Sequence, residues 1–180
     1  MRRFLPAVFL IGCALHQPLL TERAIMASPP YEKALKNVTR QGEARREFDT
    51  DVRAVATLLT PAFENAWRQE YLRVYGVPLQ EPVLQNKHLT FIFALATDEH
   101  NANQLSAYQK LWTLSFSTPT TTVAPLRVDV FDHDEAFFRY FFPYWSPWRQ
   151  MYKIEFPLDR NVENGTLHFR GVPGKIDLTW

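Results

Sequence analysis

The sequence is short of the residues on which several classes of protein depend. It has a single cysteine, Cys13, so no disulfide can form within the chain and stability must come from packing. Its six glycines leave little room for the glycine-rich loops that cradle cofactor phosphates, and we expect no cofactor. The 20 basic and 19 acidic residues nearly balance, which gives no electrostatic reason to expect a nucleic-acid partner.

Sequence signatures of the common catalytic centres are also missing. The chain has no Gly-x-Ser-x-Gly elbow, no His-Glu-x-x-His pair and no phosphate-cradling glycine loop. These absences favour a protein that is not an enzyme. Separate Ser, His and Asp side chains could still converge in space, which a sequence cannot reveal.

Residues 1–13 have the form of a secretory signal. Arg2 and Arg3 give a basic head, and residues 4–12 are an apolar run interrupted only by Pro6. Nine residues are too few for a membrane-spanning helix, which needs about 20. We therefore expect residues 1–12 to be a signal peptide. If Cys13 has no special role, this leader is an ordinary signal peptide with an incidental cysteine, or an apolar N-terminal helix.

The end of this run, Leu10-Ile11-Gly12-Cys13, resembles the lipobox of bacterial lipoproteins. The resemblance implies cleavage after Gly12, a diacylglyceryl group on the Cys13 sulfur and an acylated new amino terminus, with palmitate-type chains in the membrane. In such proteins an Asp after the Cys tends to retain the protein at the inner membrane. Ala14 stands there instead, which favours the outer membrane, facing the periplasm, in a Gram-negative host.

The remainder divides into three predicted parts. Residues 13–30 form a lipidated tether, because Pro18 and Ser28-Pro29-Pro30 keep it extended. Residues 31–77 form a helical segment, and residues 86–180 a β-sandwich domain. The fold class we predict is therefore α+β.

Two apolar stripes predict an αα-hairpin within 31–77. The first stripe has helical spacing and consists of Phe48, Val52, Val55 and Leu59. A second helix starts at Thr60-Pro61, an N-cap hydroxyl followed by a proline, and ends at Gly76.

From residue 87 the apolar period changes to two, which is typical of half-buried strands. Val172-Pro173-Gly174-Lys175 fits a tight turn between the last two of them. Short strands without intervening helices predict an antiparallel sandwich, immunoglobulin-like or related. The six predicted strands are 89–96, 111–116, 123–131, 152–156, 167–170 and 176–180.

An acidic cluster is the candidate metal site. Asp129, Asp132, His133 and Asp134 follow one another closely at the end of a predicted strand, and such oxygen and imidazole ligands suit calcium or zinc. A structural explanation is favoured, in which Asp132 or Asp134 caps a short helix that begins at Glu135.

The most unusual composition lies between residues 137 and 148, where eight of twelve residues are aromatic. We favour a lid on the core, since aromatic-rich connections close small cores. If the segment is exposed instead, Tyr144, Trp145 and Trp148 would form a binding surface for a protein, a glycan or the bilayer interface.

Three functions are compatible with these features. The first is a lipid-anchored binding or assembly protein of the cell envelope with an envelope protein partner, such as an accessory subunit of a secretion or transport machine. The second is an envelope hydrolase that uses a metal in the acidic cluster around Asp129 to Glu135. The third is a carbohydrate-binding module that uses the aromatic residues between Tyr144 and Trp148.

Overall fold

Two antiparallel sheets and three helices make up the described part of the chain. The computed structural model describes residues 26–46, 49–80, 87–97, 105, 111–162, 164–172 and 174–180. The predicted signal peptide, Cys13 and most of the predicted tether lie outside these residues. The elements are α1 Pro29–Val38, β1 Thr39–Arg46, β2 Asp49–Leu58, α2 Pro61–Tyr75, β3 His88–Thr97, β4 Trp112–Ser117, β5 Thr122–Val123, β6 Arg127–Val130, α3 Glu135–Phe141, β7 Gln150–Asp159, β8 Thr166–Gly171 and β9 Gly174–Thr179.

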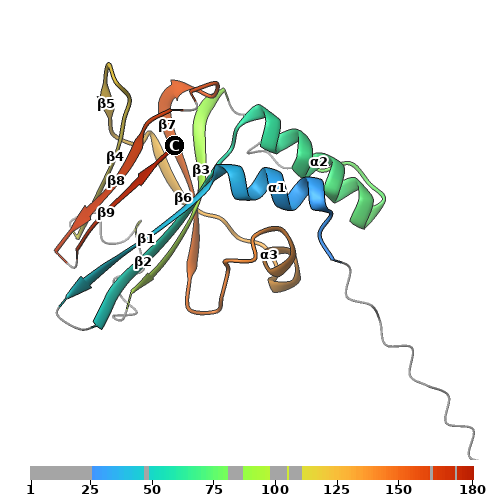
Figure 1. Cartoon of the computed structure of the whole chain (residues 1–180), viewed down its shortest axis with the longest axis horizontal. Coiled ribbons are helices and arrows are strands. Elements are labelled where there is room, and N and C mark those ends of the chain that lie inside the picture. Colours follow the sequence, from blue (N-terminus) through green and yellow to red (C-terminus); the bar gives the residue numbers. More distant parts are fainter. Residues whose placement is uncertain are drawn as a thin grey trace, which may run out of the picture.

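The strands form a five-stranded sheet, in the order β1-β2-β3-β7-β6, and a four-stranded sheet, in the order β5-β4-β8-β9. Figure 1 shows the four-stranded sheet on one side of the larger sheet and the helices on the other. The predicted mixture of helices with antiparallel sheets, consistent with a β-sandwich, is confirmed. Its immunoglobulin-like form stays a prediction.

The central strands of the five-stranded sheet are buried on both faces. One face of β3 points Phe91, Phe93 and Leu95 into the core between the sheets, while Ile92 and Ala94 pack on the helix side. This explains why residues 89–95 are an unbroken buried run rather than an alternating one. The predicted central strand at 89–96 is confirmed.

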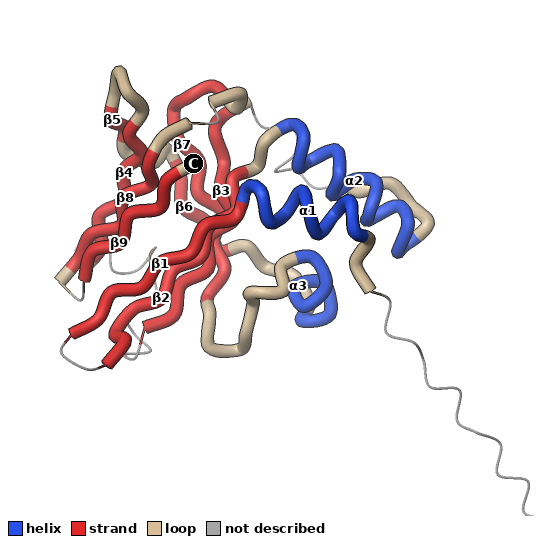
Figure 2. The backbone as a smooth tube through the Cα atoms, in the orientation of Figure 1, coloured by secondary structure: helices blue, strands red, loops and turns tan. Residues whose placement is uncertain are grey.

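The three helices cover one face of the five-stranded sheet (Figure 2). Trp67 of α2, fully buried, lies against rings of α3 such as Phe137, Phe141 and the following Phe142. Aromatic packing therefore forms a second core beneath the helices, separate from the one between the sheets. Each of these three helices is too short to cross a membrane.

Helix α2 begins and ends where its sequence predicts. The Thr60 side chain accepts a hydrogen bond from the Phe63 N–H at 3.2 Å, and Pro61 occupies the first turn. Gly76 adopts φ of 70°, a left-handed conformation that glycine reaches without a steric penalty because it has no Cβ. Its N–H donates to the Leu72 carbonyl at 2.9 Å.

The predicted αα-hairpin is wrong between α1 and α2, because residues from Thr39 to Leu58 form the β1–β2 hairpin. Val52 and Val55, assigned to one helical face, lie on opposite faces of β2 and enter different cores. Apolar residues on both faces of a buried strand can mimic helical spacing. Phe48, from the same stripe, lies outside the described residues. The helical segment 31–77 and the sandwich 86–180 therefore share one sheet, since β2 pairs with β3.

The later strands follow the predicted pattern with one correction. The predicted strand 123–131 is two strands, β5 in the four-stranded sheet and β6 in the five-stranded one. Pro125 lies between them and has no N–H for a ladder. The predicted hairpin of the last two strands is confirmed, with Gly171 opposite Gly174.

The edge strands β1 and β9 close one side of the sandwich. Arg40 Nε donates to the Thr179 carbonyl at 2.8 Å, and Trp180 Nε1 donates to the Val38 carbonyl at 2.7 Å. A Cβ on Gly42 would lie 2.5 Å from Cγ2 of Ile176, closer than real Cβ contacts. The approach of β1 to β9 therefore requires glycine at position 42.

We predict that Gly42→Ala lowers the free energy of unfolding by about 1–3 kcal/mol, because the added methyl overpacks this contact. Urea denaturation monitored by tryptophan fluorescence measures the change. Gln41→Ala, on the exposed face of the same strand, should stay within about 0.5 kcal/mol. The double variant with Ile176→Ala should lose less than the sum of the single losses. Wild-type stability of Gly42→Ala would contradict this packing.

Candidate functional site

The aromatic segment is mainly a lid. Four of its residues, Phe137, Phe138, Phe141 and Phe142, are buried beneath the helices. The favoured packing role therefore describes the first half of the segment. Its second half contains the three aromatic residues that we considered for ligand binding.

Those three residues do not form one exposed surface. Tyr144 shares a 2.8 Å hydrogen bond with Thr57 of β2, and burial raises the pKa of its phenol. Trp145 stacks on Phe138 with 6.0 Å between ring centroids. Trp148 is the most exposed of the three, with 77% of its surface accessible. Of the three, Trp148 therefore offers the most surface to a ligand such as a sugar ring.

The acidic residues at the end of β6 have separate structural partners. Asp129 lies 2.6 Å from Nε of Arg127 and 3.7 Å from Nζ of Lys153. Asp134 caps α3, accepting a hydrogen bond from the Phe137 N–H at 2.7 Å, as its helix-capping interpretation predicts.

The other two members of the acidic cluster are His133 and Asp132. His133 stacks on the Phe137 ring at 3.9 Å between centroids, and Asp132 is exposed. Within the described ranges, no three His, Cys, Asp or Glu side chains gather in a geometry that could hold a metal ion. The structure therefore gives the metal hypothesis for Asp129, Asp132, His133 and Asp134 no support.

Glu64 is a buried carboxyl that belongs neither to the acidic cluster nor to the aromatic segment. Burial raises its pKa, and the ion pair with Arg160, just after β7, acts in the opposite direction without cancelling it. Catalytic acids commonly have a carboxyl with a raised pKa, but carboxyls in structural ion pairs can have one as well. Because this pair joins the first turn of α2 to the end of β7, we assign it a structural role.

A second buried carboxyl, that of Glu70 in α2, binds Ser28, the residue just before α1. It is 3% exposed and accepts hydrogen bonds from the N–H and Oγ of Ser28, at 2.9 and 2.6 Å. Arg73 and the Tyr140 hydroxyl also donate to it, at 2.7 and 2.6 Å. Burial alone would raise the pKa of Glu70, but these hydrogen bonds outweigh burial and lower it to about 2.

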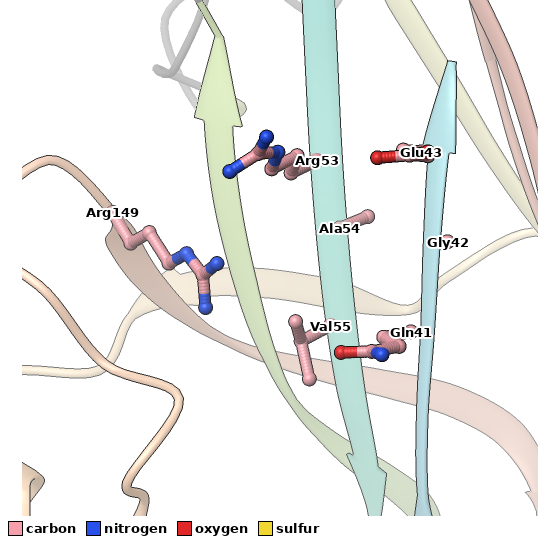
Figure 3. A pocket seen from close by; sticks show the side chains of 7 residues that line it. All are labelled: Gln41, Gly42, Glu43, Arg53, Ala54, Val55 and Arg149. Atoms are coloured by element: carbon pink, nitrogen blue, oxygen red, sulfur yellow. The ribbon is translucent and has the colours of Figure 1, made fainter. Parts of the chain in front are cut away.

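A pocket of about 430 Å³ lies on the helix-side face of the five-stranded sheet, over β1 and β2. In the β1–β2 register Gln41 stands opposite Val55 and Glu43 opposite Arg53, so these four side chains share a face. Arg149, just before β7, completes the lining (Figure 3). A second pocket, of about 650 Å³, shares Gln41 with the first and is bounded by α1 and by Pro143 and Tyr144.

The sequence analysis missed these pockets because it assigned residues 48–59 to a helix. A strand at the same place puts Arg53 on one face with Val55, and both side chains line the first pocket. Comparison of the chain with protein-family profiles, with curated proteins and with solved structures gave no match.

We predict that Glu70→Gln lowers stability at pH 7 by about 1.5–3 kcal/mol, since charge-assisted hydrogen bonds are lost. The pKa of Glu70 is lowered on folding, so its contribution is present above pH 4.5 and disappears as pH falls toward 2. Urea unfolding across pH 2–7 should therefore show a flatter pH dependence for the variant. The exposed Glu32→Gln should match wild type in both respects. An unchanged slope in Glu70→Gln would contradict the assigned pKa.

Proposed function

We propose that the protein is a lipid-anchored, non-enzymatic binding or assembly protein of the cell envelope. The observation that carries this proposal is the sequence Leu10-Ile11-Gly12-Cys13 at the end of a short basic and apolar leader. The thiol of Cys13 is the group that can become a thioether with diacylglycerol. Each buried CH₂ of acyl chain contributes about 0.8 kcal/mol, so two or more chains hold the protein stably.

The distance between the acylated residue and the domain suits an anchored module. Fourteen residues lie between Cys13 and Ser28, which caps α1. At about 3.5 Å per extended residue, the domain can stand up to about 50 Å from the acyl chains. The hydrogen bonds between Ser28 and Glu70 then fix the end of the tether on α2.

Two pockets that border β1 support a binding role for the domain. In the acidic cluster, Asp134 caps α3 and Asp129 pairs with Arg127. The sandwich, immunoglobulin-like in the form that we propose, is an architecture that serves many functions and does not choose among them. An envelope protein partner, such as a secretion or transport assembly, is the version that fits an anchored module best.

Membrane location follows from the residue after the cysteine. Ala14, in place of an Asp, supports an outer-membrane site facing the periplasm in a Gram-negative host. Changing Ala14→Asp should keep the acyl chains and move the protein to the inner membrane. This variant is the matched control for loss of the cysteine, because both changes fall at the same segment.

We predict that the native protein has lost residues 1–12, carries acyl chains on Cys13 and partitions with membranes. The Cys13→Ser variant should carry no acyl chain and leave the membrane fraction. Intact-mass spectrometry and detergent phase partition of both forms measure this. A native protein that retains its first twelve residues and stays soluble would refute the anchored role. Absence of any stoichiometric envelope partner after mild detergent extraction would count against the assembly role alone.

A further inference from the structure

Two arginines from distant parts of the chain share one pocket. Arg53 projects from β2 and Arg149 from the segment before β7, and both line the 430 Å³ pocket. Figure 3 shows the two guanidinium groups over the same part of the sheet. The pocket lies over the middle of β1 and β2, and in Figure 1 the ends of these two strands project beyond the helices.

The charges of these arginines are not balanced by the described residues around them. The Arg53 side chain makes no hydrogen bond or ion pair with the residues that the structure describes. Arg149 donates to the backbone carbonyl of Tyr144. The acid that lines the same pocket, Glu43, is paired with Arg45. Two guanidinium groups therefore face a common space without an anion between them.

The effect of one charge on the other agrees with this geometry. Burial lowers the pKa of Arg149, and the positive charge of Arg53 lowers it further. A like-charge pair of this kind destabilises the empty pocket. An anion placed between the two groups would convert the repulsion into two attractions.

We propose that Arg53 and Arg149 bind the phosphate group of an organic ligand. A guanidinium presents its N–H groups as a planar fork that matches phosphate oxygens. Two forks from different directions suit the several acceptor oxygens of a phosphate better than the two oxygens of a carboxylate. This proposal does not depend on the lipid anchor.

The neighbouring pocket provides space for the rest of such a ligand. It adjoins the arginine pocket at Gln41 and is lined partly by Leu35, Pro143 and Tyr144. Pockets of a few hundred Å³ with apolar walls and a few polar groups are typical of small-molecule sites. A soluble organic phosphate and a phospholipid headgroup share this chemistry, so the experiment must separate the two sources.

The first arm titrates the full-length protein, in non-ionic detergent, with inorganic phosphate at constant ionic strength, by calorimetry. We expect saturable binding that Arg53→Gln and Arg149→Gln each weaken about ten- to hundredfold, the usual effect of a charge-assisted hydrogen bond. Arg139→Gln, on the exposed face of α3, removes the same charge and should leave the affinity unchanged. Unfolding midpoints of all variants verify that the pocket is folded.

The second arm mixes full-length Cys13→Ser with vesicles of phosphatidylcholine, with and without phosphatidylglycerol. Recruitment by phosphatidylglycerol that requires both arginines and is reversed by inorganic phosphate identifies a headgroup. Saturable phosphate binding without recruitment identifies a soluble organic phosphate. Either result supports the proposal.

Three results would overturn it. One is the absence of saturable phosphate binding and of vesicle recruitment. Another is binding that survives both arginine substitutions. The third is binding that appears only when Asp98→Asn and Glu99→Gln are introduced together. These two acids lie outside the described residues but follow β3 directly, and such a result would make them the partners of the arginines.

Discussion

Burial of both faces of the five-stranded sheet is the constraint on which the rest of the structure depends. Strands β2, β3 and β7 carry apolar side chains on each side, so neither face can remain in water. The four-stranded sheet covers one face, and the helices with the aromatic lid cover the other. On this second face a pocket remains over the middle of β1 and β2, and two charged side chains, Arg53 and Arg149, line it. The same layering therefore produces both the stability of the domain and its candidate binding surface.

Local signals in the sequence were sufficient where one element determines its own ends. Thr60-Pro61 and Gly76 bound α2, Asp134 caps α3, and the alternation around Leu167 and Phe169 gives β8. Prediction failed at Val52 and Val55 because a strand buried on both faces loses its alternation, and nothing local distinguishes it from a helix. Pairing with β1 and β3 decides the matter, and pairing is a tertiary property.

The candidate site shows the same limit more strongly. The sequence indicated the lid and a helix cap at Asp132 or Asp134, of which Asp134 is the cap, because both features follow from neighbours along the chain. Arg53 and Arg149 are 96 residues apart and meet only because β2, β3 and β7 are successive neighbours in the sheet. The order of strands in a sheet is not written in the periodicity of any one strand. The proposed lipid anchor is the opposite case, since the resemblance of Leu10-Ile11-Gly12-Cys13 to a lipobox rests on only four consecutive residues.

The central claim is that the pocket lined by Arg53 and Arg149 binds an oxyanion, and a crystal soaked in tungstate tests it most directly. Tungstate is a tetrahedral oxyanion like phosphate, and its metal gives an anomalous signal that fixes its position. The account predicts a tungsten peak between the guanidinium groups of Arg53 and Arg149. A pocket without tungsten, in which the side chain of Asp98 or Glu99 lies between the two arginines, would contradict it.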